Sequence, residues 1–167
     1  IRPRVHLEIG ANNPLKRDLT ARYGIGSPGT SAFLFEPQPR LAAVIARKAS
    51  ELPGATFVPY AAWIRNETID FYVHQDDVGV GSSVFRHNVH VARYPGVKNN
   101  TTKVSVRALD LAEWMERFVP VGAYLSAHVD VEGAEYVLLR HLILRGQACR
   151  FSLLEFEGHA LYSPDLV

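Results

Sequence analysis

The hydrophobic pattern of the chain alternates between two periods. Short, nearly continuous apolar runs are typical of strands buried on both faces, and stretches with apolar residues three or four positions apart are typical of amphipathic helices. Predicted strands cover residues 4–9, 32–36, 55–60, 103–108, 123–129 and 148–155. Predicted helices cover residues 15–23, 39–52, 111–118 and 134–144. Such alternation with short links predicts an α/β fold, a mainly parallel sheet with helices on both faces.

Residues that favour helix ends mark the limits of these helices. Gly24 and Gly146 follow the first and last helical patterns, where glycine commonly ends a helix. Asp110 stands where it can cap the third helix. Two short apolar runs, residues 63–65 and 69–74, flank a polar, turn-like tripeptide and therefore predict an antiparallel hairpin.

A long polar stretch interrupts this pattern between residues 75 and 100. A loop of that length in a compact domain usually has a function. Its glycines permit movement, and Ser82 and Ser83 can form hydrogen bonds with the hydroxyls of a sugar-like substrate. We therefore predict a lid or acceptor-contact loop over residues 78–85, with an ordinary surface loop as the alternative.

Composition indicates an ordinary globular domain and excludes several partners. The 167 residues are 47% hydrophobic and 21% charged with a net charge of +1, so neither nucleic acid nor an anionic membrane is expected to bind. No apolar run approaches the roughly 20 residues of a membrane-spanning helix. The single Cys149 cannot form an internal disulfide, and its apolar neighbours predict a buried, inert thiol. We expect one domain over residues 1–167, with residues missing at one or both ends because strands stand close to both termini.

Three Asn-x-Ser/Thr sequons, at Asn66, Asn99 and Asn100, lie in polar, turn-like sequence. Such tripeptides arise often by chance in ordinary loops, and they are also acceptors of N-linked glycans. The sequence therefore specifies no compartment: the cytoplasm is the default expectation, and a secretory-pathway lumen stays open.

The ends of the first two predicted strands carry the pattern of a nucleotide-type site. Gly10 permits a tight turn through which backbone can approach a ligand, and Glu36 follows the second strand, where an acid accepts hydrogen bonds from ribose hydroxyls. Positions 10 and 36 are 26 apart, near the spacing of about 20 in dinucleotide sites. Asn12, Asn13 and Pro14 replace the further glycines of such sites, which favours a ligand without a pyrophosphate.

Three carboxylates crowd the end of the predicted strand 123–129. Asp130, Glu132 and Glu135 follow it with Gly133 between them, at the sheet edge where α/β proteins bind ligands. Packed acids repel one another and lose hydration, so folding alone gives little reason to place them together. The alternative is that Glu132 and Glu135 only favour the start of a helix.

Five blocks of sequence, in order, resemble the FkbM family of S-adenosylmethionine-dependent methyltransferases. The Asp-x-Glu-Gly-Ala-Glu block is the most specific of them. The blocks occupy residues 8–12, 35–37, 106–110, 130–135 and 151–155. The resemblance implies a Rossmann-like class I methyltransferase fold, of which this chain would lack the last two strands. It also implies O-methylation, often of sugar or polyketide hydroxyls.

The resemblance implies a role for each matching position. The methionine end of the cofactor would lie against Glu8, Gly10, Ala11 and Asn12. The ribose and adenine would lie against Glu36, Pro37, Tyr60, Ala61 and Ala62. Asp130 would stand beside the sulfonium and the acceptor. The chain departs from the family in having Asn13-Pro14 where a glycine is usual and His128 where a lysine is common.

A hydroxyl is a poor nucleophile, so methyl transfer to oxygen calls for a base or a metal ion. The candidate catalytic groups are Asp130, His128 and Glu132, with His159 as a further base. His128 and Asp130 point to the same side of their strand and could act as a pair. The alternative for His128 is a buried histidine with satisfied hydrogen bonds.

The end of the last predicted strand supplies further acids. Neighbouring strand ends could bring Glu155 and Glu157 near Asp130, and such oxygen ligands suit Mg²⁺. The alternatives are that Glu155, with His159, binds the acceptor through hydrogen bonds, or that these acids only cap the strand.

The sequence thus predicts an S-adenosylmethionine-dependent O-methyltransferase acting on a small-molecule or glycan hydroxyl. One alternative is a catalytically inactive, methyltransferase-like binding domain, which the departure at Asn13-Pro14 leaves open. The other is a nicotinamide-dependent oxidoreductase, against which the missing glycines argue.

Overall fold

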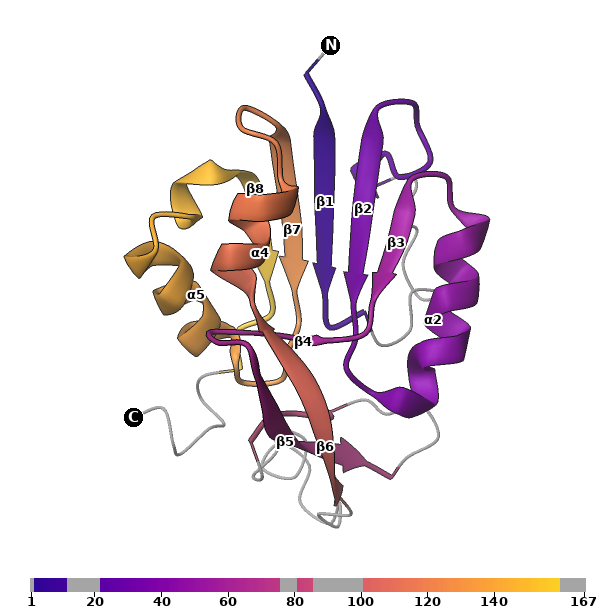
Figure 1. Cartoon of the computed structure of the whole chain (residues 1–167), viewed down its shortest axis with the longest axis vertical. Coiled ribbons are helices and arrows are strands. Elements are labelled where there is room, and N and C mark those ends of the chain that lie inside the picture. Colours follow the sequence, from indigo (N-terminus) through magenta and orange to yellow (C-terminus); the bar gives the residue numbers. More distant parts are fainter. Residues whose placement is uncertain (1, 12–21, 76–80, 86–100, 160–167) are drawn as a thin grey trace.

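A sheet of five parallel strands forms the centre of the computed structural model, which describes residues 2–11, 22–75, 81–85 and 101–159. The strand order is β3-β2-β1-β7-β8 (Figure 1). The bounds are β1 Arg4–Ile9, β2 Thr30–Phe35, β3 Ala55–Val58, β7 Tyr124–Val129 and β8 Phe151–Phe156. All four pairings are parallel, which confirms the predicted α/β class and places the carboxyl ends of all five strands at one edge.

Helices cover both faces of this sheet, as predicted. Helix α2 (Pro39–Glu51) packs Ile45 and Ala49 against one face, beside Ala32 and Leu34 of β2. Helices α4 (Leu111–Phe118) and α5 (Glu135–Leu144) pack on the other face, where the core includes Leu7, Leu111, Met115, Leu125, Leu138 and Leu142. Burial of these side chains on two faces is the main stabilising contribution to the fold.

Asp110 forms the predicted cap of α4. Its carboxylate accepts hydrogen bonds from the backbone N–H groups of Ala112 (2.9 Å) and Glu113 (3.1 Å), which satisfies two donors that the first helical turn leaves unpaired. The Nε2 atom of His141 on α5 lies 2.9 Å from the same oxygen, so this one side chain also joins α4 to α5.

A second sheet of three strands lies beyond the carboxyl edge of the first (Figure 1). It has the order β4-β6-β5, with β4 Ala61–Trp63, β5 Glu67–His74 and β6 Thr101–Asp110. The predicted antiparallel hairpin is wrong, because β6 lies between β4 and β5 and pairs with both. The turn before β5 is instead fixed against α4, where Asn66 accepts from the N–H of Asp110 (3.0 Å) and donates to Glu113 (2.8 Å).

Two predictions near the end of the chain need correction. Residues 148–150 form a short 3-10 helix, η2 (Ala148–Arg150), so β8 begins later than predicted. The guanidinium of Arg150 donates to the carbonyl oxygens of Met115 and Val119 at the end of α4, and these bonds hold η2 out of the sheet. Cys149 is exposed on this turn rather than buried.

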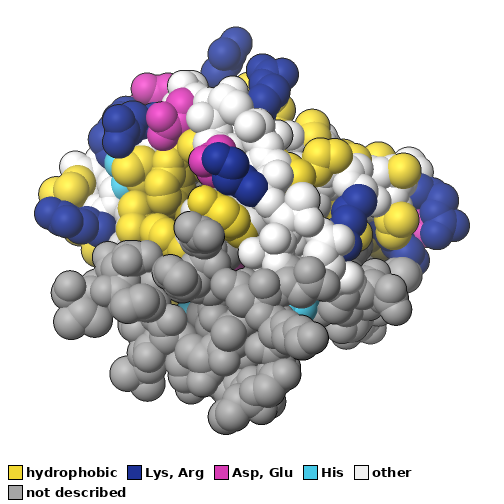
Figure 2. All heavy atoms as spheres, turned by 90° about the horizontal axis from the view of Figure 1, so that it is seen from below, with side chains coloured by type: hydrophobic (Ala, Val, Ile, Leu, Met, Phe, Trp, Pro, Cys, Tyr) yellow, Lys and Arg dark blue, Asp and Glu magenta, His cyan; other side chains and the backbone are white. Residues whose placement is uncertain are grey.

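Two features of the described surface bear on membranes and on charged partners. Within the described residues, no helix is both long enough and apolar enough to cross a membrane. Figure 2 views the end of the molecule toward which the central strands point. On that face the described Lys and Arg side chains are dispersed rather than gathered into one stripe.

Candidate cofactor and acceptor site

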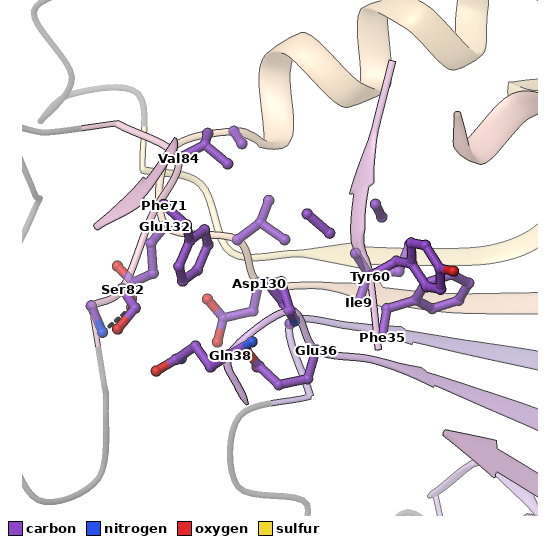
Figure 3. Close-up of a pocket in the computed structure, with 17 residues that line it drawn as sticks. Ile9, Phe35, Glu36, Gln38, Tyr60, Phe71, Ser82, Val84, Asp130 and Glu132 are labelled. Atoms are coloured by element: carbon purple, nitrogen blue, oxygen red, sulfur yellow. Dashed lines mark hydrogen bonds between the residues drawn. The ribbon is translucent and has the colours of Figure 1, made fainter. Parts of the chain in front are cut away.

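A pocket opens at the carboxyl edge of the central sheet and is closed on its far side by the small sheet (Figure 3). Its walls come from the ends of β1, β2 and β7, from β4 and β5, and from the short segment Gly81–Phe85, which we call the strap. The residues that line it are Ile9, Gly10, Phe35, Glu36, Pro37, Gln38, Tyr60, Ala61, Ala62, Phe71, Gly81, Ser82, Val84, Asp130, Val131, Glu132 and Ala134.

The turn predicted at Gly10 brings two strand ends into contact. Gly10 has φ +85°, and a Cβ at this position would lie 1.8 Å from the carbonyl oxygen of Asp130. The N–H groups of Gly10 and Ala11 both donate to the carbonyl of Phe35, and the N–H of Asp130 donates to that of Ile9. Only glycine fits such a turn, so residue 10 sets the spacing between the loops that follow β1 and β7.

Glu36 lies at the floor of the pocket, directly after β2. Its side chain is buried, and its Oε1 atom accepts a hydrogen bond from the backbone N–H of Gln38 (2.9 Å), which fixes the carboxylate beside the start of α2. In Figure 3 Glu36 and Gln38 extend together toward Asp130. Glu36 therefore contributes a fixed, buried carboxylate to the lining of the pocket.

One end of the pocket is apolar and aromatic. Tyr60, Ala61 and Ala62 line it together with Ile9 and Phe35, as Figure 3 shows for Tyr60, Ile9 and Phe35. The guanidinium of Arg107 stacks 4.7 Å from the centre of the Tyr60 ring and holds the ring in place from outside. Flat apolar surfaces of this kind suit a heterocyclic ring.

The opposite end of the pocket is acidic, and Glu132 is its centre. Glu132 adopts φ +53°, which is uncommon for a residue with a side chain. Its Oε1 atom accepts from the N–H of Gly81 (3.1 Å), and its carbonyl accepts from the hydroxyl of Ser83 (2.8 Å). Burial, together with the neighbouring charge of Asp130, raises the pKa of Glu132 to about 7. The carboxylate therefore changes its charge near neutral pH.

Glu135 has a structural role in this loop. It is fully buried, and its carboxylate accepts hydrogen bonds from the N–H groups of Val131 (3.2 Å) and Gly133 (3.0 Å). The alternative given for Glu135 from the sequence, an acid that stabilises the start of a helix, therefore describes what it does here.

His159 compensates the charge of these acids. Its Nδ1 atom lies 2.7 Å from Oε1 of Glu135, and its Nε2 atom lies 3.7 Å from Oε2 of Glu132. The hydrogen bond to Glu135 raises the pKa of His159 to about 9, so the ring is an imidazolium at neutral pH. One oxygen or nitrogen atom from each of Asp130, Glu135 and His159 lies within 4.8 Å of the others. The ion pair between His159 and Glu135 accounts for two members of this group, and Asp130 is the third.

Glu155 and Glu157 do not gather around Asp130 in the way the magnesium prediction requires. The carboxylate of Glu155 accepts from Nη2 of Arg22 and from the hydroxyl of Tyr23, each at 2.6 Å, and these bonds lower its pKa. Among the described residues, the one compact group of potential metal-binding side chains contains neither glutamate.

His128 and Glu8 belong to a buried network on the sheet rather than to the pocket. Nδ1 of His128 and Nε2 of His6 each lie 3.1 Å from a different oxygen of Glu8, and Nδ1 of His6 lies 3.0 Å from the hydroxyl of Ser126. The ring of Tyr23 stacks on His6 at 3.8 Å. Burial alone would raise the pKa of Glu8, but the hydrogen bonds to the two histidines outweigh it and hold that pKa below its usual value.

This network changes the roles predicted for two residues. His128 is bonded to Glu8, so the described contacts fit the alternative of a buried histidine with satisfied hydrogen bonds better than a pair with Asp130. Glu8 holds two histidines and is absent from the described lining of the pocket. Sequence reasoning missed His6 and Ser126. These two residues become neighbours only because β1 and β7 pair with His6 opposite Ser126.

Hydrogen bonds to β5 fix the strap in place. Ser83 exchanges two backbone hydrogen bonds with Tyr72 of β5, and the hydroxyl of Ser82 accepts from the N–H of His74 (3.0 Å). Ser82 lines the pocket. Ser83 is fully buried, and its hydroxyl donates to the carbonyl oxygen of Glu132. The rest of the predicted loop, residues 78–80, lies outside the described residues.

The predicted site residues thus fall into three groups. Those that line the pocket are Gly10, Glu36, Pro37, Tyr60, Ala61, Ala62, Ser82, Asp130 and Glu132. Those described elsewhere are Glu8, Ala11, Ser83, His128, Glu155, Glu157 and His159. Asn12, together with Asn13 and Pro14, lies outside the described residues.

No protein-family model matches the chain, and neither a curated protein nor a solved structure does.

Proposed function

We propose that this protein is an S-adenosylmethionine-dependent methyltransferase that acts on a hydroxyl group. The observation that carries the proposal is the chemistry of the pocket. Three carboxylates, those of Glu36, Asp130 and Glu132, line it beside a glycine turn and an aromatic end, and its described lining contains no Lys or Arg.

The charge of this pocket fits a cationic cofactor. When bound, S-adenosylmethionine would supply a methyl group attached to a positively charged sulfur. Asp130 and Glu132 would attract that charge, Glu36 would accept hydrogen bonds from the ribose hydroxyls, and Tyr60 with Ala61 and Ala62 would face the adenine. Among the described lining residues a pyrophosphate would meet three acids and neither Lys nor Arg, so this part of the pocket argues against a nicotinamide dinucleotide.

Proton removal falls to the acidic end of the pocket. A base works best when its pKa lies near the working pH, and Glu132, with a pKa of about 7, meets that condition. We therefore assign Glu132 as the proton acceptor and Asp130 as the group that aligns the reactants. His128 is given no catalytic part because its ring is bonded to Glu8 in the buried network.

A magnesium ion is not part of the proposal. Glu155 is engaged with Arg22 and Tyr23, and the charge beside Asp130 is balanced by the imidazolium of His159. We expect methyl transfer to proceed unchanged in the presence of EDTA.

Calorimetric titration tests the proposal. S-Adenosylmethionine and S-adenosylhomocysteine should bind in the micromolar range and NAD should not. Glu36→Ala should weaken both adenosyl ligands at least about tenfold, because hydrogen bonds to a buried carboxylate are lost. Glu51→Ala is the matched control, since Glu51 is an exposed acid at the last residue of helix α2, which begins shortly after Glu36.

Each other result has a definite meaning. Binding of NAD in preference to the adenosyl compounds would favour the oxidoreductase. Adenosyl binding without methyl transfer to any hydroxyl acceptor would favour an inactive binding domain. If none of the three ligands shows detectable binding, the proposal is contradicted.

A further inference from the structure

We infer that a groove outside the pocket binds an extended, proline-rich peptide. This outer groove has a volume of about 600 Å³, within the range of ligand-binding clefts in proteins. Its walls come from the ends of β3 and β6, from the start of β5 and from helix α4, which Figure 1 shows in front of the central sheet. The lining side chains that bear on its ligand are Tyr60, Asn66, Glu67, Arg107, Trp114 and Phe118. Tyr60 alone is common to the described linings of the pocket and the outer groove, so peptide binding there is independent of the proposed function.

Aromatic rings form the apolar part of the outer groove. Trp114 and Phe118 stand one helical turn apart on α4, with their ring centres 5.2 Å apart. Phe33 and Phe35 of β2 pack edge-on with Trp114, at 4.7 and 5.0 Å between ring centres, and hold its ring in place. Tyr60 adds a third ring from the link between β3 and β4. Grooves lined by fixed aromatic rings bind proline-rich segments, whose polyproline II conformation loses little entropy on binding.

Two residues of the outer groove carry hydrogen-bond donors that are open to a ligand. The guanidinium of Arg107, an exposed residue, stacks 4.7 Å from the centre of the Tyr60 ring and forms no hydrogen bond or ion pair within the described structure. The indole N–H of Trp114 has no hydrogen-bond partner there either, and it is not buried. A polyproline II chain leaves its carbonyl oxygens unpaired, so it offers the acceptors that these donors require.

Two side chains of the outer groove that could accept hydrogen bonds are already engaged within the protein. Oδ1 of Asn66 accepts from the N–H of Asp110 (3.0 Å), and its amide nitrogen donates to Glu113 (2.8 Å). Oε1 of Glu67 accepts from the indole N–H of Trp63 (3.1 Å). A sugar presents hydroxyls that both donate and accept, so it would compete for these oxygens. Proline has no N–H to donate, and a proline-rich segment therefore matches the open groups of the outer groove better than a sugar does.

Titration of the whole chain with a peptide of ten prolines tests this inference, with the indole N–H signals followed by NMR. The chain contains two tryptophans, so loss of one signal in Trp114→Phe assigns both. We expect the proline peptide to bind with a dissociation constant below about 1 mM and to shift the Trp114 signal. A glycine-serine peptide of the same length should do neither, and nor should the neutral sugar maltotriose.

Two variants locate the bound peptide. Trp114→Phe should weaken binding about fivefold, because the ring stays and one hydrogen bond is lost. Phe118→Ala should weaken binding about tenfold, because the peptide loses an apolar surface on which to pack. Phe156→Ala is the matched control for the second variant, since Phe156 on β8 is 47% exposed, Phe118 is 49% exposed, and Phe156 is absent from the described lining of the outer groove. The control should bind the peptide as the parent protein does.

Three results would overturn the inference. If the proline peptide does not bind the parent protein, the outer groove is no peptide site. If Phe118→Ala and Phe156→Ala bind the peptide equally well, the peptide lies elsewhere on the molecule. If maltotriose shifts the Trp114 signal and the peptide does not, the outer groove is a sugar site instead.

Discussion

At the scale of single residues, the site depends on one glycine more than on any acid. Gly10 is the point where the loops after β1 and β7 touch, and its positive φ and the carbonyl of Asp130 each exclude a side chain. The acids at positions 36, 130 and 132 hold their places in the pocket only while that contact is kept. Residue 10 therefore controls the geometry of the site without offering any chemistry of its own.

Gly10→Ala should destabilise the folded state by about 3 kcal/mol, the sum of a strained φ and a clash that moves backbone. Gly122→Ala is the matched control, since Gly122 has φ +77° but no atom within 4 Å of an added Cβ. It should cost only about 1 kcal/mol, from the backbone strain alone. Urea denaturation of both variants measures the difference. Equal losses at the two positions would show that the contact with Asp130 is unimportant.

At the scale of elements, the sequence predicted the limits of individual strands and helices, and it missed features that depend on which strands pair with one another. Strand β1 and helix α4 have the predicted limits because a buried apolar run and an Asp cap specify them directly. The Gly10 turn and the acids Glu36, Asp130 and Glu132 could be placed because every parallel strand delivers its carboxyl end to the same edge. The β4–β5 hairpin failed because β6, about forty residues further on in the chain, takes the place between them.

The His6–Glu8–His128 network was missed for the same reason. It exists because β1 and β7 pair with Glu8 opposite His128 and His6 opposite Ser126, and a register between strands 120 residues apart cannot be read from either strand. Viewed alone, each of these residues is a polar exception in an apolar run. Viewed across the pair, they satisfy one another and join the two central strands through their side chains.

Glu8→Gln should therefore lower the stability of the fold and leave binding of the proposed cofactor unchanged. A neutral amide weakens both hydrogen bonds between the buried Glu8 carboxylate and the two histidines, and losing hydrogen bonds to a buried charged group costs about 3 kcal/mol. The control is Glu155→Gln on β8 of the same sheet, where the ion pair with Arg22 is exposed to solvent and contributes little to stability. Denaturation compares the stabilities, and calorimetry at low temperature compares cofactor affinity. A folded Glu8→Gln protein with weakened cofactor binding would place Glu8 in the pocket after all.

At the scale of the whole molecule, the acid cluster joins parts that are distant in sequence. His159, which follows β8, bonds Glu135 at the start of α5, and Glu132 holds the strap that pairs with β5. The central sheet, the small sheet and α5 thus meet at one group of charges. Because that group contains an imidazolium, the stability of the entire fold becomes a function of pH.

The sign of this dependence follows from the pKa of His159, which is raised from 6.5 in the unfolded chain to about 9 in the folded protein. A raised pKa means that the folded state binds the proton more tightly, so the stabilisation is complete below pH 6.5 and is lost as the pH rises through 9. Allowing for the partial exposure of the ring to solvent, we expect the free energy of unfolding to fall by about 2 kcal/mol over this range.

His159→Gln should abolish most of that fall, because the amide carries no titrating proton. Urea denaturation at pH 6.5 and pH 9 checks both proteins, and the variant should be the less stable one at pH 6.5 and nearly equal to the parent at pH 9. A parent protein equally stable at both pH values would mean that the His159–Glu135 pair does not join β8 to α5 in solution, and that the acids of the pocket are balanced in some other way.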